Sequence, residues 1–457
     1  MGYAWRVSDA SDRWGERLPR RLGLWSTVAV LVGSTIGSGI FRTPAVVAAR
    51  VPELPLFALA WGVGALVALA GALTIAELAA AMPRSGGIYV YIREAFGRLP
   101  AFLLGWTELL ILRPSAYGAV AITSAEYLWR LVGRDGEALV GPLPLSRAQV
   151  TAAAMIAAVA LVNARGITLG ALIQNVSTVV KIGALLGLVI LGLALAPESA
   201  TAAAAAPAGA TTLAAFGVAM VGILWAYDGW CDAGFISGEV KDPQRALPRA
   251  FILGTAVVVA LYLAANAVYV AVVPLAEMAG SKLIAADVAA RLMGPIGATA
   301  VAAAVMVSTF GTLNGSMMTG PRVFYAMAED GLFFRRIAAV HPVYGTPVAA
   351  IALSAALGVV YVSSQGFAEL ADGFVIGIWP FYALAVAAVF VLRRRRPELE
   401  RPYRTWGYPL VPLLFLAASV FLLGSYALSE ARVFAVNVAV IAAGVPVYWL
   451  WKRSAGR

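Results

Sequence analysis

Two short stretches of the sequence combine glycines with small polar or acidic residues inside apolar surroundings. The first, Gly33–Phe41, has three glycines within seven residues, and the second, Trp225–Trp230, places an acid and a glycine between aromatic residues. Glycine destabilises a helix interior by roughly 1 kcal/mol relative to alanine, so a helix in the first stretch should open readily. An opened helix offers amide N–H groups to an anion and carbonyl groups to a cation. The two stretches therefore predict a site for a small zwitterion that carries an ammonium and a carboxylate on one carbon.

Close helix packing is the alternative explanation for the first stretch. Gly33 and Gly37 form a Gly-xxx-Gly pair, which lets two membrane helices approach each other. The placement of the two stretches favours interruption instead, because they fall in the first and the sixth of the apolar spans described below. Matching interruptions in corresponding helices of two five-helix halves are typical of inverted-repeat transporters.

Three charged residues lie deep in apolar stretches, where a charge costs about 2.5–3.5 kcal/mol. Lys181 lies ten residues into its span, which makes snorkelling to an interface awkward. Asp228 has three interpretations: it pairs with an ammonium, it carries a proton, or it turns towards Arg113 in a structural role. Arg113 suggests a site for an acidic substrate, but we favour a pairing with Glu108 or Asp232.

Composition sets the environment in which these residues lie. The chain has 457 residues, of which 61% are hydrophobic and 13% charged, and its mean hydropathy is +0.84. Soluble domains carry about 25% charged residues, so we exclude a soluble enzyme, a secreted disulfide scaffold and a disordered chain. The single cysteine, Cys231, and the single histidine, His341, predict no disulfide and no metal site. Basic residues that flank helices explain the net charge of +10, so we expect no nucleic-acid partner.

Apolar runs long enough to cross a bilayer recur along the whole chain and predict an all-α polytopic membrane protein with twelve transmembrane helices. Barrel strands would be about 10 residues long with an alternating pattern, which these runs do not have. The predicted spans are 24–41, 56–80, 101–129, 148–163, 171–195, 213–237, 248–273, 295–319, 347–364, 368–392, 408–428 and 433–451.

Basic residues predict the orientation of these spans. With the N-terminus inside, most of the 34 Lys and Arg residues, from Arg6 and Arg13 to Arg457, fall in cytoplasmic segments, while Arg42 falls outside. We therefore expect a multi-pass protein of the cell (inner) membrane with both termini cytoplasmic. The polar, basic start of the chain predicts no cleavable signal peptide, and the alanine-rich stretch Thr201–Ala210 is predicted to be an external loop.

The spans predict a single membrane domain with an internal division. Its expected parts are a cytoplasmic N-terminal segment (1–21), two inverted repeats of five helices (22–195 and 213–392), two further helices (408–451) and a cytoplasmic tail (452–457).

Ordered motifs along the whole chain resemble the amino acid–polyamine–organocation (APC) superfamily, and within it the L-amino acid transporter family. The motifs are Gly37–Phe41, Glu77-Leu78, Pro83–Tyr89, Arg113–Ser115, Asn163–Gly166, Lys181, Tyr227–Trp230, Glu239–Pro243, Ser308–Gly315, Arg322 and Ala326–Ala328. The resemblance implies a LeuT-like fold with a 5+5 inverted repeat, two added C-terminal helices, and breaks in helices 1 and 6. The chain departs from the family pattern at Cys231–Gly234, where many members have an Asn-containing sequence, and this leaves the side-chain selectivity open.

The resemblance also implies how the substrate is held. Glycine-rich backbone in the first stretch would bind its carboxylate through amide groups, and the second stretch would receive its amino group through carbonyl groups. The predicted substrate-binding residues are Ile36, Gly37, Ser38, Gly39, Ile40, Ser115, Tyr227, Asp228, Gly229 and Trp230.

Lys181 has a more specific role by the same resemblance. Its amine would occupy the place where sodium-coupled relatives hold a cation, and would tie its helix to Ile36 and Gly37 and to the region of Ser308. This arrangement fits a structural tie or a proton site, and the sequence does not separate the two.

Other residues are candidates for gates. Glu77, Glu239 and Arg322 are predicted near cytoplasmic helix ends, where they either snorkel to the interface or form a salt-bridge network that closes an outward-facing transporter. Aromatic residues could cap the substrate, although core packing or an interfacial belt explains each of them as well. These aromatic residues are Trp106, Trp230, Trp379, Phe381 and Tyr382.

The sequence therefore predicts secondary-active transport of L-amino acids, with neutral side chains favoured because no second basic cluster lies mid-membrane. Alternating access would move helices 1, 2, 6 and 7 against helices 3, 4, 8 and 9. Exchange is the expected mode and proton-coupled symport the alternative, while a channel and a non-transporting sensor are rivals from other classes. We expect no enzyme activity, no cofactor and, because no cysteine lies on a predicted external loop, no disulfide-linked partner.

Overall fold

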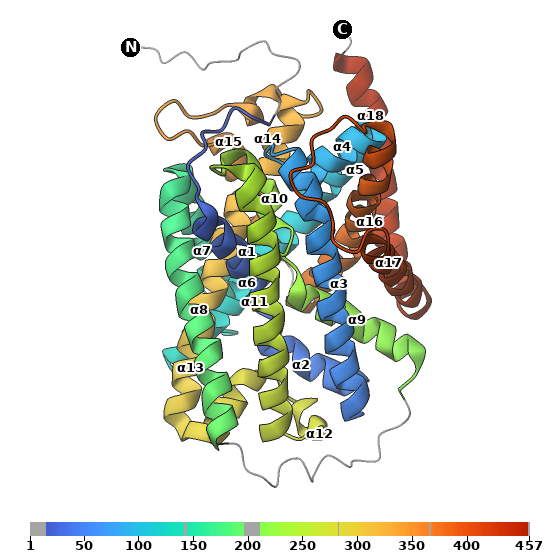
Figure 1. Cartoon of the computed structure of the whole chain (residues 1–457). Helices are drawn as coiled ribbons and strands as arrows, with labels where there is room; N and C mark the ends of the chain where they lie inside the picture. The colour runs from blue at the N-terminus through green and yellow to red at the C-terminus, as the bar shows by residue number, and fades with distance from the viewer. Residues whose placement is uncertain (1–14, 141–143, 196–210, 282, 365–366, 456–457) are drawn as a thin grey trace.

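The computed structural model describes residues 15–140, 144–195, 211–281, 283–364 and 367–455, which form a bundle of helices (Figure 1). No strand occurs among these residues, and two isolated bridges join Leu22 to Val240 and Leu139 to Ser146. The prediction of an all-helical chain is confirmed. The predictions that concern Arg6, Arg13, Thr201–Ala210 and Arg457 lie outside the described residues.

The first half of the chain contains long helices joined by short turns. α7 begins at a capping box, in which Ser146 and Gln149 satisfy each other's backbone amides. The elements are α1 (Leu24–Thr35), α2 (Gly39–Arg50), α3 (Leu54–Ala81), α4 (Ile88–Phe96), α5 (Arg98–Thr107), the π-helix η1 (Glu108–Leu112), α6 (Arg113–Leu131), α7 (Arg147–Ala164) and α8 (Ile167–Leu195).

The second half continues in the same way and ends in a pair of helices at one side of the bundle (Figure 1). Its elements are α9 (Leu213–Tyr227), α10 (Asp232–Phe235), the 3-10 helix η3 (Ser237–Glu239), α11 (Pro243–Val272), α12 (Leu275–Met278), α13 (Ile284–Thr319), α14 (Pro321–Glu329), the 3-10 helix η4 (Arg335–Ala338), α15 (Val348–Val362), α16 (Phe367–Arg395), α17 (Leu410–Ser429) and α18 (Ala431–Ala455).

Among the described residues, 9 helical segments are long and apolar enough to cross a membrane. α9 and α15 are apolar but shorter, and the predicted third span, 101–129, is divided among α5, η1 and α6. The total of twelve crossings, the inverted repeat, the domain division and the cytoplasmic placement of the termini stay predictions.

The first predicted span, 24–41, is too short, because the helical path continues in α2 to Arg50. Arg42, which we placed in an external loop, lies inside α2 and forms an ion pair with Glu126 of α6. A charged partner on a neighbouring helix removes the need for this arginine to reach water.

The helix breaks occur where the glycines predict them, and they touch each other. α1 ends at Thr35 and α2 begins at Gly39, while α9 ends at Tyr227 and α10 begins at Asp232. A Cβ atom on Gly39 would lie 2.4 Å from the Cα atom of Ala226, so only glycine lets the backbone of one break approach the backbone of the other so closely.

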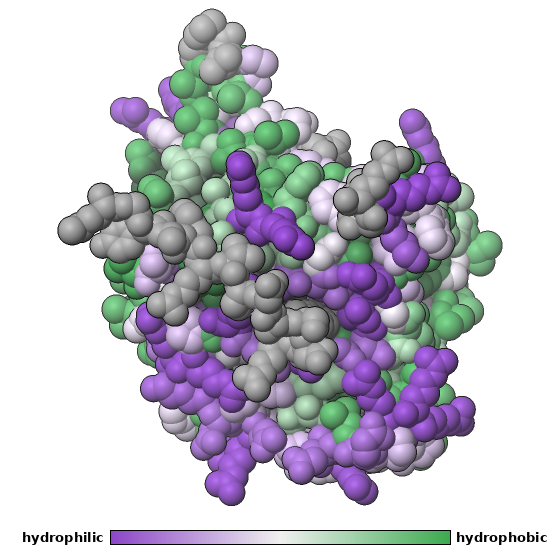
Figure 2. Space-filling view, turned by 90° about the horizontal axis from the view of Figure 1, so that it is seen from above, coloured by the Kyte–Doolittle hydropathy of each residue, from purple (hydrophilic) through white to green (hydrophobic). Residues whose placement is uncertain are grey.

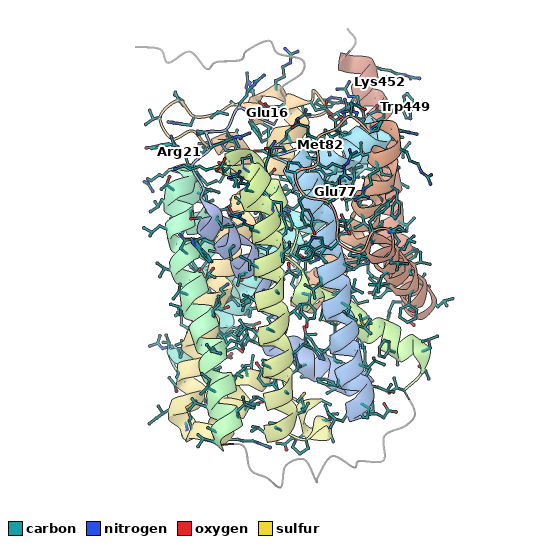
Figure 3. All side chains as sticks on the ribbon, viewed as in Figure 1. Glu16, Arg21, Glu77, Met82, Trp449 and Lys452 are labelled. Atoms are coloured by element: carbon teal, nitrogen blue, oxygen red, sulfur yellow. The ribbon has the colours of Figure 1, made fainter. Side chains whose placement is uncertain are left out.

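The sides of the bundle are apolar, and one end is rich in hydrophilic residues. Leu193 and Leu428 expose 75% and 87% of their surface on the sides, where lipid would cover them. Figure 2 shows hydrophilic residues gathered over the end of the bundle that is seen from above. Glu16, Arg21 and Lys452 lie at that end (Figure 3), so the first described residues and the end of α18 share one side of the protein.

Candidate substrate cavity at the two helix breaks

The two helix breaks border a single cavity between α1, α2, α6, α9, α13 and α16. The cavity has ≈ 580 Å³ of empty space, which includes the part that opens to solvent. Its lining residues are Ser34, Thr35, Gly37, Ser38, Gly39, Glu108, Arg113, Ala116, Val120, Trp225, Asp228, Gly229, Asp232, Thr312, Ser316, Phe374, Ile378 and Tyr382.

The first break presents amide groups to the cavity. The carbonyl of Thr35 accepts a hydrogen bond from the amide of Gly37 at 2.8 Å, and α2 begins at Gly39 without a side-chain cap from Ser38. The first amides of a helix have no partner within the helix. Because Gly37, Ser38 and Gly39 line the cavity, these amides and the positive end of the helix dipole can bind an anion there.

The carbonyl groups of the first break are occupied by side chains of α8 and α13. Lys181 is fully buried, and its Nζ donates to the carbonyls of Gly33 and Ile36 at 2.7 Å each and to Oγ1 of Thr312 at 3.0 Å. Oγ of Ser308 donates to the same Ile36 carbonyl at 3.0 Å. The carbonyls of Gly33 and Ile36 therefore turn towards the lysine, while amides at the start of α2 stay available to the cavity.

The second break has the opposite arrangement. Gly229, with φ of 103°, turns the chain sharply against the backbone of Thr35, where a Cβ atom would lie 2.8 Å from the Thr35 amide nitrogen. The Trp225 carbonyl accepts from the amide of Asp228, and within the described residues the carbonyls of Ala226 and Tyr227 accept no backbone hydrogen bond. Free carbonyls at the end of α9 suit a cation.

The side chain of Asp228 is held by α16. Its Oδ1 accepts a hydrogen bond from Oη of Tyr382 at 2.7 Å, and the thiol of Cys231 donates to the same Tyr382 oxygen at 3.3 Å. Asp228 and Tyr382 both line the cavity. One of the three interpretations of Asp228 was a structural contact with Arg113. In the structure the side chain of Asp228 instead binds the hydroxyl of Tyr382.

A charged wall closes one side of the cavity. Arg113 pairs with Glu108, with Nε 2.8 Å from Oε2, and its Nη1 lies 3.4 Å from Oγ1 of Thr319, which donates to Asp232 at 3.1 Å. The π-helix η1 precedes Pro114, which has no amide to donate, so the helix widens beside the buried pair. Among the described residues, no group of three His, Cys, Asp or Glu side chains could hold a metal ion.

The cavity also has an apolar part of its wall, which contains residues that the sequence analysis missed. Trp225 meets Phe374 edge to face at 5.2 Å between ring centroids, and Ile378 of α16 and Val120 of α6 complete this wall. Phe374, Ile378 and Tyr382 are spaced four residues apart on one face of α16. That spacing is the signal that could have selected them, but it is common to every buried helix.

Several residues predicted to bind substrate do not line the cavity. Trp230 and Tyr227 are buried at 2% and 1% exposure, Trp230 against Tyr382 and Phe415 and Tyr227 against Trp61 and Tyr262. The residues of the predicted set that are absent from the lining are Ile36, Ile40, Ser115, Tyr227 and Trp230. Their side chains fill the core around the breaks.

Trp379, a gate candidate, also lies outside the cavity. Its Nε1 donates to Oγ of Ser419 in α17 at 3.1 Å, and its ring stacks on Phe415. It holds α16 against α17.

The charged gate candidates belong to two separate clusters. Arg322 and Glu239 form a buried ion pair at 2.9 Å, and the carbonyl of Glu239 accepts from the amides of Arg21 and Leu22. Glu77 instead binds residues near the end of α16. In this structure Glu239 and Arg322 form one ion pair, which we call the gate pair, and Glu77 has other partners; the network that would close an outward-facing transporter stays a prediction.

Comparison with known proteins agrees with this geometry. A family model described as amino acid permease matches residues 22–451. The chain is 30% identical over 439 residues to the serine/threonine exchanger SteT of Bacillus subtilis. This aligned region covers 95% of this chain and 98% of the exchanger. It is 31% identical over 415 residues to the human b(0,+)-type amino acid transporter 1, which covers 89% and 82% of the two chains. It is also 30% identical over 466 residues to the human large neutral amino acids transporter small subunit 2, which covers 97% and 83%.

Proposed function

We infer the function from one premise: the chain belongs to the amino acid permease family of the APC superfamily. It is thus a multi-pass membrane protein that transports amino acids, and it is not an enzyme. We propose that it exchanges neutral L-amino acids by alternating access.

The proposal depends on one observation: the first break offers amide groups, whereas the second break offers carbonyl groups. A substrate carboxylate would accept from the amides of Ser38 and Gly39, and its ammonium would donate to Asp228, beside the open carbonyls at the end of α9. The two breaks are in contact through Gly39 and Ala226, so both headgroup charges of one amino acid are within reach of the same small region.

The apolar wall supports a neutral side chain. Trp225, Phe374 and Ile378 offer an apolar surface on which an uncharged side chain can pack without stranding a charge.

A second candidate is a substrate with an additional cationic group. Glu108, Asp228 and Asp232 line the cavity together with only one basic lining residue, Arg113. This excess of carboxyl groups would be relieved by an ammonium, or by protons. It favours dibasic amino acids over acidic ones, and a substrate panel separates them from neutral amino acids.

Lys181 takes the place of a coupling cation in this proposal. Its Nζ donates to carbonyls of the first break that lack helical partners, and it joins α1 to α13 through Thr312. We propose that Lys181 stays in this place during exchange. Release of its proton would instead make the protein a proton-coupled symporter, which is the alternative mode.

The gate pair supports alternating access. Arg322 on α14 and Glu239 after α10 lie on opposite sides of the predicted moving interface, with side-chain exposures of 1% and 0%. Their separation would open the cavity towards the predicted cytoplasmic end.

Counterflow in proteoliposomes tests the proposal. The purified protein is reconstituted with unlabelled amino acids inside, and uptake of a labelled panel of neutral, dibasic and acidic amino acids is measured with and without a pH gradient. We expect trans-stimulated uptake of neutral amino acids that does not need the gradient. Uptake without trans-stimulation would indicate a channel, uptake that follows the gradient would indicate symport, and binding without flux would indicate a sensor.

A further inference from the structure

Glu77 is a buried carboxylate in α3, near the hydrophilic end of the bundle (Figure 3). Its side chain is 1% exposed and accepts four hydrogen bonds: from Nε and Nη2 of Arg393 at 2.9 and 2.6 Å, and from the amide and hydroxyl of Thr405 at 2.7 and 2.8 Å. Arg401 adds an ion pair at 3.6 Å. Removing one partner from a buried pair of this kind is costly, so this contact is a rigid point of the fold.

All partners of Glu77 come from the end of α16 and the segment that follows it. Arg401 donates to the carbonyls of Leu392 and Arg396, which closes the C-terminal turn of α16. The guanidinium of Arg393 also lies 3.8 Å from the centroid of the Tyr408 ring. Glu77 therefore fixes the position of one end of α16 relative to α3.

α16 is also the helix that holds the second break. Tyr382 lies 11 residues before Arg393, about 16 Å along the helix axis. Its hydroxyl donates to Asp228, which directly follows α9, and α3 packs against α9. Asp228 follows α9 and Tyr382 lies on α16. Because α9 packs against α3, and the end of α16 is bound to α3 through Glu77, α3 sets the separation of these two residues.

We propose that Glu77 is a positioning residue for the substrate cavity. By holding α16 against α3, it sets the contact between Tyr382 and Asp228 and thereby the shape of the carbonyl-rich break. The proposal rests on the proposed function, because it assigns Asp228 and its break to the substrate ammonium. It also removes Glu77 from the gate: its partners do not include either member of the gate pair.

The test combines transport with a reporter inside the protein. Cys231 is the only cysteine of the chain, it is buried, and its thiol contacts Tyr382, so its alkylation by N-ethylmaleimide reports on that contact. For Glu77→Gln we expect an about tenfold higher KM in counterflow, with Vmax per folded transporter within about twofold of the native value. We also expect alkylation of Cys231 to be about tenfold faster, since exposure of the thiol follows the displacement of α16.

Glu94→Gln is the matched control. Glu94 pairs with Arg84 and with Arg396, close to the same end of α16, and its side chain is 11% exposed. This variant should leave KM and the alkylation rate within about twofold of the native protein, because the Arg396 side chain is 46% exposed and water can replace its lost partner. An effect as large as that of Glu77→Gln would overturn the proposal, as would a Glu77→Gln protein with native KM and native alkylation.

A double mutant tests whether Glu77 changes KM through its influence on Tyr382. If Glu77 acts through Tyr382, the combination of Glu77→Gln with Tyr382→Phe should raise KM no further than Tyr382→Phe alone. Additive effects would contradict the proposal. If Glu77→Gln fails to fold, Arg393→Gln gives the same readouts with a less buried residue, and native values there would overturn the proposal. Absence of counterflow in the native protein would refute the proposed function instead, while alkylation of Cys231 would still test the helix contact.

Discussion

The two helix breaks face the same cavity, but they are built in opposite ways. In the first break, side chains from α8 and α13 occupy the carbonyls, and the amides of α2 remain open. In the second break, the carbonyls at the end of α9 remain open, and a neighbouring helix holds the acidic side chain of Asp228. The difference matches the two charges of an amino acid headgroup.

The comparison also separates the partners on which each break depends. The first break is fixed by Lys181, Ser308 and Thr312, which are buried and lie on two long helices. The second break is fixed by Tyr382 on α16, whose far end depends on Glu77. We therefore expect the largest loss of transport when the Lys181 amine is removed from the first break, and we expect variants at the second break to change affinity and selectivity.

Lys181→Ala should have the largest effect. It leaves the carbonyls of Gly33 and Ile36 without their ammonium, at about 1–3 kcal/mol for each unpaired group, so we expect net uptake to fall about a hundredfold. Uptake in proteoliposomes is compared with Lys241→Ala, which removes an exposed lysine. Undiminished uptake by a folded Lys181→Ala protein would show that the carbonyls of the first break do not need this partner.

Gly39→Ala tests the contact between the breaks. The added methyl group would lie 2.4 Å from the Cα atom of Ala226, and the resulting overlap should reduce transport about tenfold. Gly62→Ala in α3 is the control, because a Cβ atom there meets nothing within 4 Å and alanine favours the helix. Equal activity of the two variants would mean that the breaks need not touch.

Much of this comparison could be predicted from the sequence, for physical reasons. Glycine content identified where the helices break, and the cost of a charge in hydrocarbon singled out Lys181, Arg113 and Asp228. The family resemblance implied the polarity of each break, but the contacts that produce it could not be predicted, because they depend on which distant side chains reach the two breaks. Thr312 and Tyr382 supply those contacts from helices more than 100 residues away in the chain.

The residues around the breaks show the same limit. Tyr227 and Trp230 flank Asp228 and Gly229 in the sequence, yet their side chains pack in the core, Tyr227 against Trp61 and Tyr262 and Trp230 against Tyr382 and Phe415. Glu77 was grouped with Glu239 and Arg322 because all three lie near helix ends. Position along a helix does not determine which neighbouring helix supplies the partner, and Glu77 binds Arg393 instead.

Asp228→Asn tests the second break with a smaller expected effect. The amide keeps the shape of the side chain and can still accept from Tyr382, but it removes the negative charge beside the open carbonyls. We expect KM for neutral amino acids to rise about fivefold, the size of one charge-assisted hydrogen bond. Counterflow measures KM for neutral and for dibasic amino acids. A larger rise in KM for the dibasic amino acids would favour the second candidate substrate class. Unchanged KM for every substrate would remove Asp228 from the site.

Ser308→Ala should have the smallest effect, and it tests whether the hydrogen bonds that hold the first break are redundant. The hydroxyl of Ser308 is one of three side-chain donors to the Ile36 carbonyl, with Lys181 and Thr312 as the others. Because two donors remain, we expect KM to rise only about twofold to threefold, as for the loss of one neutral hydrogen bond. Thr309→Val is the control, since the hydroxyl of Thr309 donates to the carbonyl of Val305 in its own helix. A loss as large as that of Lys181→Ala would mean that the hydroxyl, and not the ammonium, keeps the carbonyls of the first break turned away from the substrate.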